Sequence, residues 1–210
     1  MEQSSTPRIL RKEIPPKMRG AKGYLKAREY LRRDFNNRCA YCMTHEYEAG
    51  GPESFCINHF QPRSKGGEIN HYDNLYWACR ICNHIKRDHW PTPEERQRGF
   101  RFADPCQEQD YGVHFVENMQ GELISLTSCG EYHIGQLRLN RDFLKQHRQE
   151  RNDLILLMAE TLAQIQNLEQ SIQTVRVVET TLLYSRYLKT WRDQLALSIP
   201  LIPLPLGTTD

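Results

Sequence analysis

Residues 55–88 have the sequence FCINHFQPRSKGGEINHYDNLYWACRICNHIKRD, and the segment Cys39-Ala-Tyr-Cys42 precedes them. Two CxxC pairs, Cys39/Cys42 and Cys79/Cys82, are thus separated by 36 residues. A CxxC turn presents two thiolates to one ion, so two such turns complete a closed tetrahedral Cys₄ site, which suits zinc. We therefore expect a structural Zn²⁺ that holds the fold together and keeps no coordination position open for chemistry.

The segment between and after the cysteine pairs predicts a strand, a loop, a second strand and a helix. FCINHF alternates like a strand that ends at His59, and Gly66-Gly67 marks a turn in the following loop. YDNLYWAC begins a second strand, and CRICNHIKRD has the pattern of a helix start. The expected fold class is α+β, with a small zinc-stapled ββα core.

Basic residues are concentrated at the N-terminus, although the formal charge of the whole chain is only +2. Residues 1–33 hold ten Lys/Arg against three Asp/Glu, a net of +7, and the remainder holds 18 against 23, a net of −5. Lysine and arginine gain affinity for nucleic acids by releasing counterions. We expect a basic arm that contacts phosphates; the alternative is a solvated terminal tail.

The C-terminal half predicts short strands followed by helices. HFVE and ELISLT flank NMQG, which indicates a hairpin, and YHIGQLRL is expected to follow within the same region of strands. A 4-3-4-3 apolar spacing from Leu154 to Val175 predicts a helix with a heptad-like stripe, and a β-branched cluster at 174–181 indicates a break before a second helix at about 179–197. The expected divisions are an arm at 1–33, a core at 34–90, a connector with short strands at 91–139, a helical region at 140–198 and a Pro-rich tail at 199–210.

Composition excludes several classes of protein. No stretch approaches the ~18 apolar residues that cross a membrane, and the polar opening residues lack the apolar segment of a secretory signal. Seven cysteines in a chain without such a signal favour a reducing cytoplasm and metal ligation over disulfides. Cys56, Cys106 and Cys129 are expected to be bystanders.

In order and spacing, these motifs resemble the HNH nuclease motif of the ββα-metal fold in its zinc-bound form. The family pattern is a CxxC pair, an acidic residue and His, a Px[SK]xGG-like loop, Asn-Leu, and a second CxxC followed by His or Asn. FADP, HF, GELISLT and LRLNRDFL further downstream are similar, more weakly, to segments of HNH proteins from bacterial restriction or phage-defence loci. The positions that match the motif are Cys39, Cys42, His59, 62–67, Asn74, Leu75, Cys79, Cys82 and Asn83.

The resemblance implies a metal-dependent endonuclease that hydrolyses phosphodiester bonds of DNA. His59 would be the general base that activates water. Asn74 would bond to the His59 backbone and orient the ring, and Asn83 would ligate one catalytic ion, Mg²⁺ or Mn²⁺, that steadies the departing 3′ oxygen. Arg63, Lys65, Lys86 and Arg87 would contact phosphates.

The sequence departs from the family pattern at Asn58, where an acidic residue normally helps to bind the catalytic ion. A site made of Asn58 and Asn83 contains no protein anion. Three alternatives remain open: an active site with weak metal affinity, a site that borrows a carboxylate from Asp73 or Asp88, or a degenerate nuclease that serves as a nucleic-acid-binding or adaptor subunit. The helical region would bind a second copy or a partner such as a defence ATPase, or pack within the chain.

Overall fold

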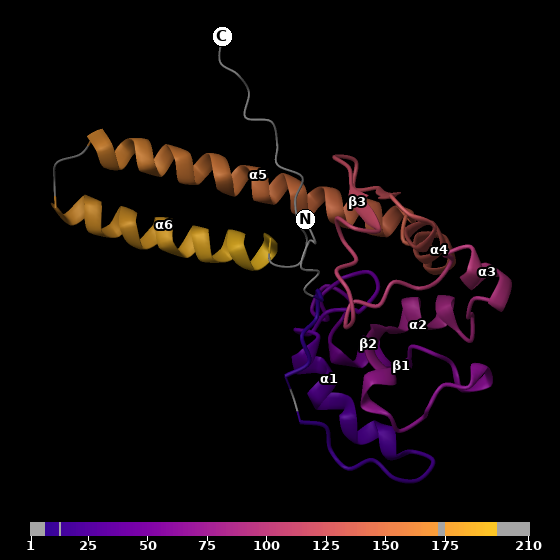
Figure 1. The fold of residues 1–210 in the computed structure, drawn as a ribbon. Coiled ribbons are helices and arrows are strands. Elements are labelled where there is room, and N and C mark those ends of the chain that lie inside the picture. Colours follow the sequence, from indigo (N-terminus) through magenta and orange to yellow (C-terminus); the bar gives the residue numbers. More distant parts are fainter. Residues whose placement is uncertain (1–6, 13, 172–174, 197–210) are drawn as a thin grey trace, which may run out of the picture. The chain divides into compact units, whose positions relative to one another are not determined.

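The computed structural model describes residues 7–12, 14–171 and 175–196 (Figure 1). These residues fall into two compact units. The first, called the core unit, comprises residues 1–116 and 123–141, and the second, called the helical unit, comprises residues 117–122 and 142–210. Neither long helix, nor any shorter helix in the described part of the chain, combines the length and apolar character of a membrane span.

The centre of the core unit is the expected ββα arrangement. Strand β1 (Phe55–His59) pairs antiparallel with β2 (Leu75–Cys79), from Phe55 opposite Cys79 to His59 opposite Leu75. Helix α2 (Arg80–Lys86) follows β2 directly and contacts both strands. All five residues of β2 are buried, because α1 contacts the strand as well as α2. A strand covered in this way is expected to be a continuous apolar run.

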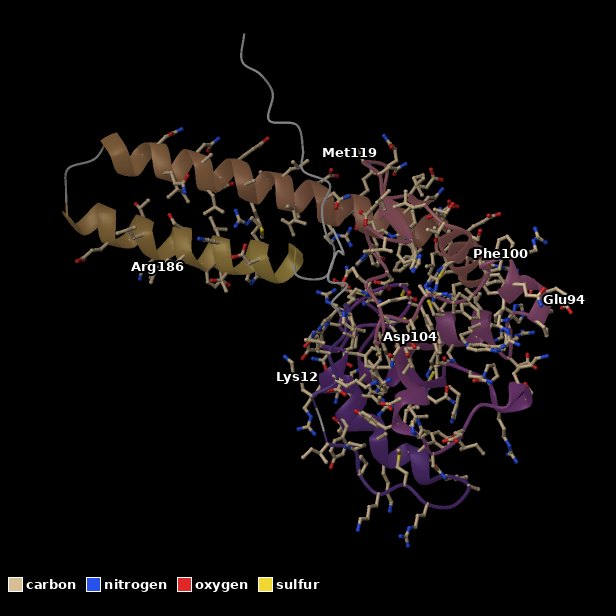
Figure 2. The ribbon with its side chains drawn as sticks, viewed as in Figure 1. Lys12, Glu94, Phe100, Asp104, Met119 and Arg186 are labelled. Atoms are coloured by element: carbon tan, nitrogen blue, oxygen red, sulfur yellow. The ribbon has the colours of Figure 1, made fainter. Side chains whose placement is uncertain are left out.

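Short elements surround this centre. The basic segment contains a 3₁₀ turn, η1 (Gly23–Ala27), and α1 (Arg28–Asp34), and three further 3₁₀ turns are η2 (Pro52–Ser54), η3 (Arg63–Lys65) and η4 (Tyr72–Asn74). The connector contains α3 (Pro93–Gln97), β3 (Phe115–Glu117), β4 (Leu123–Ser125) and α4 (Ser128–Leu137). Asp104, labelled in Figure 2, accepts a hydrogen bond from the Tyr76 hydroxyl and so ties the connector to β2.

The connector confirms the predicted hairpin and corrects one element. Strands β3 and β4 pair as a two-stranded sheet around the predicted turn. The segment YHIGQLRL, expected among short strands, lies mostly in α4. Thr127 caps this helix by accepting a hydrogen bond from the Gly130 backbone N–H, and Cys129, His133 and Leu137 are buried at helical spacing. The cap and this 4-4 spacing favour helix over strand.

The basic N-terminal segment differs from the arm that its charge predicts, since two of its arginines are interior groups. Arg8 Nε lies 2.7 Å from Asp110 Oδ1, and the Asp110 side chain is 1% exposed. The Arg11 guanidinium carbon lies 4.9 Å from the centre of the Tyr72 ring, and the same side chain donates to the Leu75 carbonyl at 2.9 Å. These two side chains stabilise the core unit, and other cations of the segment remain exposed: Lys12, Lys17, Arg19, Lys22, Lys26 and Arg33.

The helical unit is a pair of adjacent helices, α5 (Asp142–Ser171) and α6 (Val175–Ala196), of which α6 returns alongside α5 (Figure 1). In the described part of α5, the buried residues are Leu144, Arg148, Ile155, Met158 and Leu162. The expected stripe is therefore displaced, since Leu154 is 36% exposed. Helix α6 begins four residues before the predicted position, and the predicted tail at 199–210 lies outside the described residues, as does Ile172 of the stripe.

Candidate functional site

Four buried thiols meet at the end of the hairpin where β2 ends. Cys39 and Cys42 come from the turn after α1, Cys79 ends β2, and Cys82 lies in the first turn of α2. Their sulfur atoms all lie within 4.8 Å of one another, and the Cys42 and Cys79 sulfurs are 3.8 Å apart. Four sulfurs bound tetrahedrally to zinc at ~2.3 Å stand ~3.8 Å apart. The cluster therefore fits a Zn(Cys)₄ site.

The surroundings of the cluster also suit an anionic metal complex. Hydrogen bonds from Cys39 and the other two thiols lower the pKa of Cys42 well below its usual value, although burial opposes this. Arg141 places a guanidinium nitrogen 3.6 Å from the Cys82 sulfur. A cation at this distance offsets part of the negative charge that four thiolates and Zn²⁺ carry together.

A chain of hydrogen bonds links Tyr41, Asn58 and Asn83. The Tyr41 hydroxyl donates to Asn58 Oδ1 at 2.5 Å, and Asn58 Nδ2 donates to Asn83 Oδ1 at 2.6 Å. Asn58 is 4% exposed and Tyr41 only 1%. The Asn58 amide is thus fixed by a buried hydrogen bond to Tyr41, which lies in the turn that carries Cys39 and Cys42. The structure brings together the two residues that the sequence predicts as ligands of the catalytic ion.

The His59 ring is held in one tautomer. His59 ends β1, is half-buried, and has Nε2 3.0 Å from the Ile69 carbonyl oxygen. A carbonyl oxygen only accepts hydrogen bonds, so Nε2 carries the proton in the neutral ring. Nδ1 is then the nitrogen with the free lone pair, and it is the atom of this ring that can take a proton from water.

Asn74 anchors the loop that follows β1, which corrects the expectation that it bonds to the His59 backbone. Its Oδ1 accepts from the Gln61 backbone N–H at 2.8 Å, and its Nδ2 donates to the Gln61 and Glu68 carbonyls at 3.1 and 2.9 Å. A side-chain amide that is matched to two backbone groups of one residue clamps that residue. Asn74 thus fixes the two ends of the loop and positions His59 indirectly.

The loop clamped by Asn74 presents two exposed cations, Arg63 and Lys65, on η3. Gly67 allows the loop to close, because a Cβ there would lie 1.9 Å from the Gln61 carbonyl oxygen. The Gly66 backbone is left-handed, with φ of 86°. The loop is therefore a tight turn whose two long cationic side chains are exposed to solvent.

Residues 39–89 match the family model of the HNH endonucleases. The match covers 51 of the 210 residues, and the matched region is called the HNH domain. No curated protein and no solved structure matches the chain. The matched region contains the four thiols, His59, Asn74 and the two amides, and the ββα arrangement with clustered cysteines is that expected of a small zinc-bound HNH core.

Lys86 of the HNH domain lies in the interior, which corrects its expected role as a phosphate contact. Its side chain is 0% exposed, donates from Nζ to the His59 carbonyl at 3.3 Å, and lies over the Phe102 ring at 5.1 Å. Burial lowers the pKa of this ammonium to about 7. Lys86 thus stabilises the end of β1 through the His59 carbonyl. Because its side chain is buried, it cannot contact a phosphate at the surface.

The other charged candidates of the HNH domain lie at its surface. Arg87 is exposed and donates to His84 Nε2 at 3.2 Å. The Asp73 side chain is 63% exposed, and its Oδ1 lies 3.9 Å from Arg11 Nε. This carboxylate therefore pairs with an arginine. Asp88 is also exposed. The side-chain hydrogen bonds described for Asn58 and Asn83 join them to each other and to Tyr41, and all three groups are neutral.

A second group of potential ligands, Glu108, His114 and Cys129, lies outside the HNH domain. Burial would raise the pKa of Glu108, but hydrogen bonds led by that from Arg101 lower it to about 2. Arg101 donates to both Glu108 oxygens, at 2.5 and 2.7 Å, and burial raises the pKa of Cys129 to about 12. A carboxylate already neutralised by arginine and a protonated thiol describe a structural network, in keeping with Cys129 as a bystander.

The sequence alone missed three groups that contact residues of the site: Tyr41, which bonds to Asn58, the Ile69 carbonyl, which accepts from His59, and Tyr24, whose ring packs edge-on against the His59 ring. Tyr41 occupies a variable position of the first CxxC pair, and spacing rules for zinc ligands assign no role to such positions. Tyr24 lies in the basic segment, outside the motif, and its sequence neighbourhood does not point to His59. A backbone carbonyl leaves no trace in a sequence, so only the coordinates reveal what Ile69 does for His59.

Proposed function

We propose that the protein is a metal-dependent endonuclease that hydrolyses phosphodiester bonds of DNA. The observation that carries this proposal is the state of His59: its Nε2 is committed to the Ile69 carbonyl, so Nδ1 is available as a base at the end of β1. The neighbouring residue in the strand is Asn58, which contacts Asn83. A proton acceptor next to two amide oxygens is the minimal equipment for metal-assisted hydrolysis of a phosphodiester.

The chain's own residues would divide the work as follows. His59 Nδ1 accepts a proton from the water that attacks phosphorus, the bond to the 3′ oxygen breaks, and this oxygen takes a proton from a solvent water, so the products carry a 5′-phosphate and a 3′-hydroxyl. Arg63, Lys65 and Arg87 bind flanking phosphates, Lys86 holds the His59 carbonyl, and Asn74 holds the backbone of Gln61, two residues further on.

The amides of Asn58 and Asn83 would hold the catalytic Mg²⁺ or Mn²⁺, since amide oxygens are hard ligands that such ions accept. When bound, the ion stabilises negative charge on the phosphate and the leaving oxygen. Rotation of the Asn58 amide by half a turn directs its oxygen towards Asn83, and the Tyr41 hydroxyl can then accept from the amide nitrogen that replaces it. The donor set therefore fits a hard divalent ion, with the substrate supplying the negative charge.

The test is nicking of a supercoiled plasmid in Mg²⁺ or Mn²⁺ by the wild type and by His59→Ala. We expect the wild type to cleave, and His59→Ala to lose about 10²–10⁴-fold in rate, the usual contribution of a general base. The variant should retain its zinc and its circular dichroism. Absence of cleavage by the wild type with either ion, or equal rates for both proteins, would contradict the proposal.

The second candidate function is a zinc-stabilised nucleic-acid-binding or adaptor subunit without catalysis. The direct hydrogen bond between Asn58 and Asn83, with no carboxylate described beside it, favours this candidate. It predicts that the wild type binds DNA in a gel-shift experiment but leaves it intact with either ion. An effector role in bacterial defence, with a partner ATPase or second copy on α5 and α6, rests on the weak downstream resemblance and is tested by phage plating on cells that express the protein.

A further inference from the structure

One aromatic side chain from outside the family match lies against the candidate general base. The rings of Tyr24 and His59 have their centroids 5.1 Å apart and an interplanar angle of 67°, an edge-on contact. Tyr24 belongs to η1 in the basic segment, fifteen residues before the first residue of the HNH match. The side chain is half-buried, so the contact lies at the margin of the site and not in the deep core.

The turn that carries Tyr24 is docked firmly at this place. Asn70 Nδ2 donates to the Gly20 carbonyl at 2.8 Å, and the Gly23 N–H donates to the same carbonyl at 3.2 Å. A Cβ on Gly23 would lie 3.0 Å from Asn70 Oδ1, so the turn approaches the Asn70 side chain closely. Ala27, at the end of η1, is 0% exposed and anchors the other side of Tyr24.

The docking point and the His59 hydrogen bond are neighbours in the chain. Asn70 holds the basic segment, and Ile69, directly before it, accepts the hydrogen bond from His59 Nε2. A single hydrogen bond still permits an imidazole to tilt and turn about that bond. The edge-on contact with Tyr24 restricts this motion. The hydrogen bond to Ile69 and the ring contact with Tyr24 together fix the direction in which Nδ1 points.

We propose that Tyr24 is a positioning residue for His59, and that the N-terminal basic segment thereby completes the catalytic site of the HNH domain. The expected effect of Tyr24 on cleavage rests on the proposed nuclease function, whereas its effect on the orientation of the His59 ring does not. Small displacements of a catalytic group reduce rates strongly, by about 10²-fold for 1 Å. Lys22 and Lys26 are exposed and lie on either side of Tyr24 in the sequence. In the same arrangement they would contact the phosphates next to the cleaved bond.

The test compares Tyr24→Ala and Tyr24→Leu with Tyr24→Phe, and uses Tyr30→Ala as the matched control, because the described ring contact of Tyr30 is with Arg33. In the full-length protein, we expect Tyr24→Ala and Tyr24→Leu to lower kcat on the order of 10–100-fold with KM changed less than about 2-fold. Tyr24→Phe and Tyr30→Ala should stay near wild type. The leucine variant retains bulk, so it carries the test if the alanine variant fails to fold.

The second measurement reads the ring without cleavage. In ¹⁵N-resolved long-range NMR spectra, the two His59 ring nitrogens should be widely separated in the wild type, as in a single Nε2–H tautomer, and should converge in Tyr24→Ala and Tyr24→Leu as the tautomers interconvert. Unchanged spectra in folded variants overturn the proposal, whatever happens to kcat. If the wild type does not cleave but the spectra change as expected, the nuclease function fails and the positioning role stands.

Discussion

The two ends of the β1–β2 hairpin present opposite surroundings to a metal ion. At the end where Phe55 faces Cys79, four buried thiols lie within 4.8 Å of one another. Towards the other end, where His59 faces Leu75, the groups that meet are two neutral amides and a tyrosine hydroxyl. Helix α2 contributes to both through adjacent residues, Cys82 and Asn83, so the difference lies in chemistry and charge.

This contrast indicates that the two ions would have different lifetimes on the protein. Four soft anionic ligands enclose zinc and bind it as part of folding. Two amide oxygens supply no charge, so a hard ion at the second place would depend on the phosphate that arrives with the substrate. If the proposed function holds, one end would retain its ion permanently and the other would recruit an ion for each reaction.

The largest effect is expected at the thiol end. Cys39→Ser and Cys79→Ser should abolish zinc binding and unfold the core unit, since structural zinc supplies about 10–16 kcal/mol in small zinc domains. Circular dichroism and the zinc content of the purified protein measure this. Cys56→Ser is the control, because Cys56 is half-buried and lies outside the cluster. A Cys39→Ser protein that folds normally without zinc would disprove the structural role.

The amide end should respond in the opposite sense to an added charge. Asn58→Asp introduces an anion next to Asn83, and we expect the Mg²⁺ concentration for half-maximal cleavage to fall about tenfold, which corresponds to about 1.4 kcal/mol of added binding free energy. A Mg²⁺ titration of plasmid nicking measures the change. Asn36→Asp, on an exposed residue after α1, controls for added negative charge. An unchanged Mg²⁺ requirement would show that residue 58 is not a ligand.

Lys86, beneath the amide end, should make the stability of the core unit depend on pH. Burial lowers the pKa of Lys86 from its usual 10.5 to about 7 in the folded state. Between these two pH values the unfolded chain therefore binds more protons than the folded chain. The free energy of unfolding must then rise with pH across this range, by up to about 1.4 kcal/mol per pH unit.

Urea denaturation at pH 7, 8 and 9 measures this rise, and the difference between the wild type and Lys86→Met isolates the contribution of Lys86 from that of the thiols. We expect the rise to be smaller in Lys86→Met. Parallel pH dependence in the two proteins would mean that Lys86 remains charged in the interior, where it would lie over the Phe102 ring as a cation.

The smallest effect is expected on the exposed loop that follows β1 at the His59 end of the hairpin. Arg63→Ala and Lys65→Ala should each weaken DNA binding uniformly across sequences and reduce the slope of log K against log salt by ~1. Binding is measured by fluorescence anisotropy at several salt concentrations, without divalent ions. Arg138→Ala is the control, on an exposed cation after α4. Equal salt slopes for all the variants would exclude the loop from the DNA contact.

Sequence reasoning predicted those parts of the molecule that repeat a spacing. The CxxC pairs led to the thiol cluster, strand alternation and the double glycine led to β1 and its loop, and the match to the HNH family confirms the recognition of this region. The turn chemistry of NMQG led to the β3–β4 hairpin. Each of these depends on interactions between residues close together in the chain or on ligand geometry.

The features that the sequence did not reveal depend on long-range contacts. Arg8 looks like a solvated cation until Asp110 is placed beside it, and Lys86 looks like a surface residue until Phe102 and Trp90 cover it. Asn74 was expected to bond to His59 and instead clamps Gln61, a difference of two residues that no spacing rule resolves. Charge and residue type alone did not distinguish a buried arginine from an exposed one.

The ion pair of Arg8 and Asp110 sets an order of events during synthesis of the chain. These two residues are 102 positions apart, so the ribosome must release the chain beyond residue 110 before the pair can form. The residues that surround the zinc ligands emerge earlier and can fold around their ion first. The chain's first described segment is then among the last to dock, and a fragment that stops before residue 110 leaves the Arg8 guanidinium without its carboxylate.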